Sequence, residues 1–467
     1  MMRYYYCRIV VVFFFFIWIK DLFGRAEASP VEFLPGFDGP LPFHLETGYI
    51  GVDEGENVEL FYYFVRSSSS SNGNDDPLIL WLVGGPGCSG LSALLYEIGP
   101  LFIDKGEDEG LPKLSLNPYA WTKLTNIIFL DLPVGTGFSY AKTLNAAHST
   151  GSQSCHQAYQ FLRKWLIDHP EFASNPFYIG GSSYTGMTVP FIARLISDGN
   201  EAGVEPRINI KGYVLGNGAT FPDEGNYKIP FAHGMGLISD ELYESLMQTC
   251  EGNYVNVDSS NHPCLDNLDT FHQLVDDLSG EQILDPTCER IDSRSSRNGH
   301  RVLYNEERIC TKKCYTYRHQ YVPIWANNPS VQEALHIREN YNMRRGALLD
   351  CGSDVTVVCL TLMGRGIALL FTRILARKAI DHLYIAVTTT WLCLSFRRKR
   401  GLDLLTIRLW MSGDNGLYVG KLPGMYTRTY ANNMTFATVK GGAHVAPESN
   451  PEECFAMFER WISYKPL

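Results

Sequence analysis

The chain has 467 residues, of which 45% are hydrophobic and 13% aromatic, so it can bury a large core. Its 40 basic and 50 acidic residues give a formal net charge of −10, which argues against nucleic acid as a partner because nucleic-acid binding needs a basic surface. The chain also carries 12 cysteines, so the compartment in which it folds decides whether disulfides form.

The N-terminus has the order of a secretory signal peptide. Two arginines precede the apolar run Ile9–Ile19, and Ala26–Ala28 matches an A-x-A cleavage pattern. Because eleven apolar residues are short for a membrane span, we expect residues 1–28 to be removed rather than to anchor the chain. The secretory pathway makes disulfides feasible, and it makes Asn433, in Asn-Met-Thr, an acceptable N-glycosylation site.

Strands alternate with helices in the first half of the chain. A β-rich opening over residues 29–66 is followed by apolar runs that end in glycine, proline or aspartate. The expected strands are Glu46–Val52, Val58–Val65, Leu78–Val83, Asn126–Leu130, Phe177–Ile179 and Gly212–Leu215, with an amphipathic helix over Cys155–His169. This alternation predicts an α/β fold with a mostly parallel central sheet and helices on both faces.

The stretch Phe177–Gly186 predicts a nucleophile. An apolar strand ends in two glycines, presents Ser183, and passes into a helical run from Met187 to Ile196. A serine on such a sharp strand-to-helix turn is exposed at the top of the sheet, where its hydroxyl can attack a carbonyl carbon. The alternative is a glycine-rich turn whose serine only caps the helix.

Two distant stretches favour the catalytic interpretation. Trp81–Ser89 is an apolar strand that ends in glycines, whose backbone N–H groups can face a developing oxyanion. Phe436–His444 is a strand-like run that delivers His444 after two glycines. A serine followed by a later histidine, with an acid between them, is the chain order of the α/β-hydrolase triad. We expect Gly85 and Tyr184 to supply the two oxyanion N–H groups.

Seven stretches together form a specific pattern: Leu45–Gly51, Trp81–Ser89, Glu97–Pro100, Asp131–Tyr140, Gly181–Gly186, Gly212–Asn217 and Thr435–Ser463. In this order they resemble the plant serine carboxypeptidase-like family, and most closely its acyltransferase branch. The resemblance covers roughly residues 30–338 and 412–467. It implies an α/β-hydrolase fold over residues 29–467, no cofactor or metal, and a location outside the cell or in the vacuole.

From about residue 220 to 330 the chain becomes rich in loops and cysteines, with a helix expected over Asp240–Thr249. We interpret this block as a cap inserted between core strands. Zinc is the rival explanation for the cysteines, but paired C-x-x-C knuckles are lacking. The resemblance implies disulfides Cys250–Cys264 and Cys288–Cys314, and a bridge from Cys88 to Cys351 or Cys359.

Residues from about 341 to 411 depart from the family pattern. Ten basic residues and four acids lie between Arg345 and Met411, in a chain that is otherwise acidic. We interpret the segment as a retained intron or a shifted frame, with a genuine basic insertion as the alternative. Its apolar run His382–Phe396 has only fifteen residues and many threonines, so we expect no membrane span there.

The family pattern resumes at Ser412–Asp414 without its triad acid. The family reads Ser-Gly-Asp-x-Asp, with the second aspartate as triad acid, and Gly416 holds that position here. Asp414 is the nearby substitute, so either a shortened loop recruits it or His444 lacks a carboxylate partner. Near the C-terminus, we expect Asn450 to cap a helix that opens with Pro451.

The resemblance also implies substrate-binding positions at Val83, Gly84, Glu97 and Ser182. In the family's peptidases an asparagine precedes the glycine loop, and an acid before the serine pairs with a glutamate to bind the substrate's free carboxylate. Here Val83 and Ser182 replace the asparagine and the acid, and only Glu97 is kept. An unpaired carboxylate costs about 1–3 kcal/mol, so exopeptidase activity is disfavoured.

We therefore expect an acyl-enzyme reaction in which Ser183 attacks a carbonyl, His444 transfers the proton, and water or an alcohol accepts the acyl group. The first hypothesis is transfer of acyl groups from glucose esters to small-molecule acceptors. The second is a serine carboxypeptidase acting on peptides. The third is a catalytically impaired member of the family.

Overall fold

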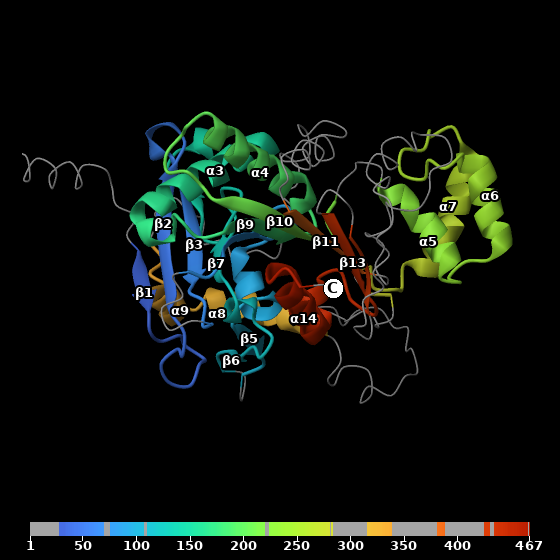
Figure 1. The fold of residues 1–467 in the computed structure, drawn as a ribbon. Coiled ribbons are helices and arrows are strands. Elements are labelled where there is room, and N and C mark those ends of the chain that lie inside the picture. Colours follow the sequence, from blue (N-terminus) through green and yellow to red (C-terminus); the bar gives the residue numbers. More distant parts are fainter. Residues whose placement is uncertain are drawn as a thin grey trace, which may run out of the picture.

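The computed structural model describes residues 28–69, 75–106, 110–219, 224–280, 282–283, 315–338, 381–387, 425–429, 434–465 and 467. Most of its strands form one sheet (Figure 1). In spatial order they are β1 (Ser29–Val31), β2 (Leu45–Val52), β3 (Val58–Val65), β7 (Asn126–Leu130), β4 (Leu78–Leu82), β9 (Phe177–Ser182), β10 (Ile210–Gly216), β11 (Asp381–Val387), β13 (Met434–Val439) and β12 (Met425–Thr429).

The middle of this sheet is parallel, as the alternation of strands and helices predicts. Strands β7, β4, β9, β10, β11 and β13 pair in parallel, whereas β1, β2, β3 and β12 pair antiparallel with their neighbours. The short β8 (Tyr140–Ala141) adds to β3, and β5 (Leu101–Asp104) forms a separate hairpin with β6 (Lys113–Leu116). The predicted α/β fold is therefore confirmed.

Helices lie on both faces of the sheet (Figure 1). The long helices α3 (Gly151–Asp168) and α4 (Thr185–Glu201) lie on one face, and α14 (Pro451–Ile462) lies on the other with α8 (Tyr321–Ala326) and α9 (Pro329–Ala334). The shorter helical turns are η1 (Glu54–Glu56), α2 (Gly90–Ser92), η2 (Ala93–Glu97), η4 (Trp121–Lys123), η5 (Leu144–Ala147), η6 (Pro170–Phe172), η7 (Glu224–Tyr227), η8 (Tyr315–Gln320) and α13 (Ala446–Ser449).

One of the two predicted helix starts differs from the structure. Helix α3 begins at Gly151, four residues before the expected Cys155, because Thr150 and Gln153 form a reciprocal capping box. The predicted start of α14 is confirmed, since the helix opens with Pro451 and Asn450 holds the N-cap position, but the Asn450 side chain makes no capping hydrogen bond. Its Oδ1 instead accepts a hydrogen bond from Ser449, and only its backbone carbonyl bonds the helix, at Cys454 N–H.

The C-terminal helix is fixed to the core by aromatic stacking. The ring of Phe458 lies parallel to that of Trp121, with 3.8 Å between centroids, and Trp121 in turn meets Trp81 of β4 edge-on. All three side chains are almost completely buried. His444 lies in the segment just before α14, and this packing places that segment beside the sheet.

The cap is a separate small helical lobe in Figure 1, with its own apolar cluster. It comprises α5 (Lys228–Gly234), α6 (Asp240–Cys250) and α7 (His262–Val275). The predicted Cys250–Cys264 disulfide is confirmed and joins α6 to α7. Helices α8 and α9 pack into the main core through Trp325 and Val331, so the cap's helices end before them.

Several predictions fall wholly or largely outside the described residues: the signal peptide, the Cys288–Cys314 bridge and the glycosylation site at Asn433. Cys88 is disulfide-bonded, and its partner lies outside the described residues. Strand β11 falls inside the atypical segment 341–411, which therefore supplies a central strand between β10 and β13. In the part of the chain that the structure describes, no helix is long and apolar enough to cross a membrane.

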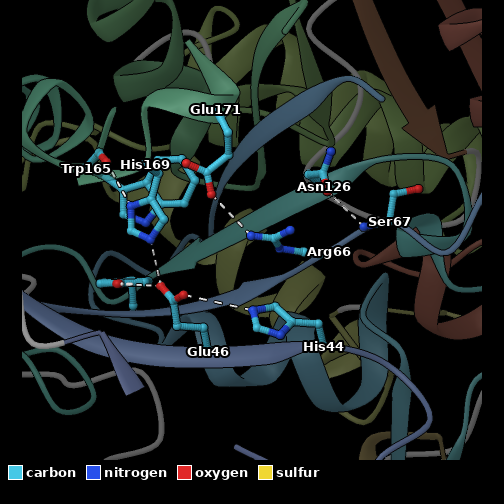
Figure 2. A network of polar contacts seen from close by, with 9 residues as sticks. His44, Glu46, Arg66, Ser67, Asn126, Trp165, His169 and Glu171 are labelled. Carbon is cyan, nitrogen blue, oxygen red and sulfur yellow. Dashed lines mark hydrogen bonds and ion pairs between the residues drawn. The ribbon is translucent and has the colours of Figure 1, made fainter. Parts of the chain in front are cut away.

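A buried ionic network joins β2 to α3 (Figure 2). Glu46 Oε1 accepts hydrogen bonds from His169 Nε2 at 3.0 Å and from the Tyr62 hydroxyl at 2.8 Å. The His169 Nδ1 lies 2.9 Å from the Trp165 carbonyl oxygen, and its ring stacks on the Trp165 indole. With an acceptor facing each ring nitrogen, His169 is best satisfied as the imidazolium.

Burial opposes both charges of this pair, but their mutual contacts outweigh it. The pKa of Glu46 is lowered to about 2 despite its burial, because His169, His44 and Tyr62 stabilise the carboxylate. Burial likewise lowers the pKa of His169, yet the hydrogen bond and attraction to Glu46 raise it overall. The pair therefore stabilises the fold fully between the ordinary pKa values of 4.5 for glutamate and 6.5 for histidine.

We predict that Glu46→Gln lowers the free energy of unfolding most between about pH 4.5 and 6.5, by about 1–3 kcal/mol. The loss shrinks below pH 4.5, where the unfolded glutamate takes up a proton while the folded Glu46, with a pKa of about 2, is still ionised. It also shrinks above pH 6.5, where the unfolded histidine loses its proton while the folded His169 still holds one. Thermal denaturation at pH 3.5, 5.5 and 8.5 measures it. Glu171→Gln, which breaks the more exposed Arg66–Glu171 pair of Figure 2, is the matched control. A loss that does not vary with pH contradicts the assignment.

Candidate active site

Ser183 lies on a strained turn between β9 and α4. Its φ is +60°, a left-handed conformation that serine rarely adopts, and its side chain is half-buried. The turn is fixed by backbone hydrogen bonds: Ser183 N–H donates to the Gly216 carbonyl, while Ala219 and Gly186 donate to the Ser183 carbonyl. This is the strand-turn-helix geometry that presents a nucleophilic serine at the edge of a sheet.

The glycine loop after β4 touches this turn directly. A Cβ placed on Gly84 would lie 2.6 Å from Ser183 Cβ and 2.9 Å from the Tyr184 backbone nitrogen, so only glycine fits there. Gly85 follows with a φ of +103°. The contact places the backbone of Gly84 against that of residues 182–184, and the roles of Gly85 and Tyr184 as oxyanion donors stay a prediction.

Asp131, at the end of β7, holds the far side of the glycine loop. Its Oδ1 accepts hydrogen bonds from the Ser89 hydroxyl at 2.6 Å and from Gly90 N–H at 2.8 Å. Its Oδ2 accepts one from Phe138 N–H at 2.9 Å. Burial raises the pKa of Asp131 to about 6, although these three hydrogen bonds favour the carboxylate. Asp131 thus ties the glycine loop to the loop after β7.

His444 leaves the carboxyl end of β13 through a turn at Gly441. The amide nitrogen of Asn217 donates to the His444 carbonyl at 2.5 Å, and Gln282 Nε2 donates to the Gly441 carbonyl at 2.7 Å. The N–H of Ala443 donates to Ser449 Oγ. Ser183 and His444 are therefore both bonded to the segment 216–219 after β10. Asp414 and Gly416 lie outside the described residues, so the triad acid stays a prediction.

The predicted substrate-binding positions differ in exposure. Val83 is half-buried and lines a small pocket with Pro86 and Tyr184. Ser182 is only 5% exposed, and Glu97 only 3%. The structure therefore encloses Glu97 within the protein instead of presenting it at the surface.

The charge of a second buried carboxyl group, that of Glu448, acts on Glu97. Burial and the charge of Glu448 together raise the pKa of Glu97 to about 8, against the opposing effects of His319 and Ser92. Glu448, on α13 just after His444, bonds His319 Nε2 at 2.9 Å. The Ser92 hydroxyl lies 3.4 Å from Glu97 Oε1. Glu97 thus carries a proton below about pH 8, and its acidic neighbour is Glu448.

These features define a class of protein, the α/β-hydrolases: a parallel sheet with a strained serine after one strand and a histidine after the last parallel strand. The chain belongs to the serine carboxypeptidase family, whose sequence profile matches residues 35–464. It is 42% identical to serine carboxypeptidase-like 11 of Arabidopsis thaliana, over 94% of this chain and 95% of that protein. It is 45% identical to serine carboxypeptidase-like 9 of the same plant, over 94% and 95%.

A similar solved structure is KEX1(delta)p, a prohormone-processing carboxypeptidase from Saccharomyces cerevisiae. Its TM-score is 0.67 and its identity 19%, over 93% of this chain and 95% of that chain. At this identity the likeness supports the fold alone. The family assignment makes the chain a serine carboxypeptidase-family hydrolase, as the seven sequence stretches predict.

Sequence reasoning missed the residues that hold the site in place. Asp131, Asn217 and Glu448 were noticed only as parts of family stretches, and His319 was not singled out. A usable signal exists for the first two, since each is a polar residue directly after a parallel strand. No group of histidine, cysteine and acidic residues able to hold a metal ion occurs among the described residues.

We predict that Glu97→Gln makes the protein more stable than wild type at alkaline pH. A carboxyl group whose pKa rises from 4.5 to about 8 on folding costs stability progressively as the pH rises between those values. Glutamine keeps the shape of the side chain without the charge. The variant's free energy of unfolding should therefore exceed that of wild type by about 1–3 kcal/mol at pH 8.5. Thermal denaturation at pH 5 and 8.5 tests this, with Glu32→Gln, an exposed glutamate, as control. Equal pH dependence of Glu97→Gln and wild type contradicts the prediction.

Proposed function

We propose that this chain is an acyl-transferring serine enzyme, in which Ser183 forms an acyl-enzyme from a glucose ester and a small-molecule alcohol accepts the acyl group. The observation that carries the proposal is the state of the three positions that bind a free carboxylate in the family's peptidases. Val83 and Ser182 offer no charge or amide there, and Glu97 is buried beside Glu448. A peptide carboxylate finds no cationic or amide partner at these positions.

The proposed reaction has two balanced steps. Ser183 Oγ attacks the ester carbonyl while His444 takes the hydroxyl proton, and the oxyanion accepts hydrogen bonds from Gly85 and Tyr184 N–H. The tetrahedral intermediate collapses, and His444 returns the proton to the departing glucose oxygen. The acceptor hydroxyl then attacks the acyl-enzyme, gives its proton to His444, and regenerates Ser183 when that proton moves to Oγ.

The triad acid decides how fast this reaction runs. Loss of that acid lowers the rate about 10⁴-fold in serine proteases, because the histidine is no longer held in the right tautomer. If Asp414 is recruited as the acid, the chain works at ordinary rates. If it is not, the chain is the impaired family member of the third hypothesis, with residual activity from the oxyanion N–H groups and substrate binding.

Peptidase activity is the second candidate, because the family's carboxylate-binding glutamate is kept as Glu97. Its burial and the substitutions at Val83 and Ser182 weigh against it. Secretion, glycosylation and a final location outside the cell or in the vacuole belong to this proposal as well. They are supported by the N-terminal pattern and the Cys250–Cys264 disulfide.

We predict that purified protein transfers the benzoyl group of 1-O-benzoylglucose to alcohol acceptors at least about 10-fold faster than it cleaves a blocked dipeptide. This rate ratio follows from the cost of binding a peptide whose carboxylate has no hydrogen-bond partner, about 1–3 kcal/mol. Chromatography of the products gives both rates, and Ser183→Ala should abolish both. Dipeptide cleavage as fast as benzoyl transfer contradicts the proposed acyl transfer and favours the peptidase.

A further inference from the structure

Asn217 connects the two proposed catalytic residues. It follows β10, is 1% exposed, and has a φ of +47°. Its side-chain nitrogen donates to the His444 carbonyl at 2.5 Å and lies 3.4 Å from the Ala443 carbonyl. The residues beside Asn217 bond Ser183. The Gly216 carbonyl accepts a hydrogen bond from Ser183 N–H, and Ala219 N–H donates one to the Ser183 carbonyl.

The residue type suits this place for two independent reasons. Asparagine enters the left-handed region more readily than other residues with a side chain, apart from aspartate. An amide also carries a donor end, and two main-chain carbonyls face it, which fixes the orientation of the amide group. Aspartate has the same shape but would place an oxygen against those carbonyls. The arrangement thus requires both the backbone freedom and the N–H donor.

We propose that Asn217 is a positioning residue that sets the place of His444 relative to Ser183. It bonds the His444 main chain, so it determines the position of the imidazole ring and leaves the pKa of the ring unchanged. Gln282 and Ser449 bond the same loop at Gly441 and Ala443, whereas Asn217 belongs to the segment 216–219 that also bonds the Ser183 turn. The inference rests on the proposed roles of Ser183 and His444, and is independent of the acyl donor.

The rate of proton transfer is the property that this contact controls. A misplacement of about 1 Å at a catalytic group can cost about 10²-fold in rate. Asn217→Gly keeps the backbone conformation and deletes the amide, so it isolates the contact. We expect kcat for p-nitrophenyl acetate hydrolysis and the rate of fluorophosphonate labelling to fall about 10²-fold. KM should change little, and the midpoint of the pH profile should stay in place.

The matched control is Asn175→Gly. Asn175 is also a buried asparagine that donates to a main-chain carbonyl, that of Asp76 at 2.7 Å, but it lies just before β9, at the other end of that strand from Ser183. Its loss should lower the melting temperature without changing kcat per folded molecule. If Asn217→Gly reacts like wild type, or loses no more than Asn175→Gly, the positioning role is overturned.

Crystal structures of wild type and Asn217→Gly give a readout that needs no activity. We expect the main chain of residues 443–444 to shift away from Ser183 by about 1 Å in the variant. An unchanged loop contradicts the proposal, even in a chain that proves inactive. Conversely, intact labelling of Ser183 without transfer from a glucose ester would defeat the proposed function and leave the role of Asn217 standing.

Discussion

The site depends on one close backbone approach, that of Gly84 to the Ser183 turn. Strands β4 and β9 pair in parallel up to Leu82 and Gly181, so both chains turn at the same edge of the sheet. There is no space for a Cβ between them, because it would lie 2.6 Å from Ser183 Cβ. The absence of a side chain at Gly84 lets the glycine loop and the nucleophile turn pack as one unit.

The parallel sheet brings the other parts to the same edge. Asp131 follows β7, Asn217 follows β10, and His444 leaves the carboxyl end of β13. In open α/β sheets, the carboxyl ends of the strands are where ligands bind. Hydrogen bonds between these loops then fix their relative positions: Asp131 to Ser89 and Gly90, and Asn217 to His444. The loops that carry Asp131, Asn217 and His444 are far apart in the sequence but are held at one edge of the sheet.

The sequence predicted the features that local physics determines. The apolar runs gave β7 with correct bounds and β4 within one residue, and the glycines around Ser183 indicated the turn. The Cys250–Cys264 bridge spans only 14 residues and joins two neighbouring helices, and the resemblance identified it. The start of α3 was missed because a reciprocal side-chain cap at Thr150 and Gln153, not hydrophobic periodicity, sets it.

What could not be predicted depends on contacts between distant residues. The charge of Glu448 acts on Glu97, which is distant in the sequence, only because α13, just after His444, packs against η2. Asn217 meets His444 only because β11 lies between β10 and β13 and pairs in parallel with both, so the carboxyl ends of all three strands lie at one edge of the sheet. No periodicity or motif encodes either contact. Such residues become visible when the sheet order is known, since the order decides which strand ends are neighbours.

The account is tested most directly by fluorophosphonate labelling of Gly84→Ala, alongside its stability. If the glycine loop and the Ser183 turn form one packed unit, the added methyl should lower the free energy of unfolding by about 1–3 kcal/mol. Labelling of Ser183 should fall about 10²-fold through displacement of the turn. Gly203→Ala, where an added Cβ meets no atom within 4 Å, controls for general destabilisation. Labelling of Gly84→Ala at the wild-type rate, with unchanged stability, would contradict the account.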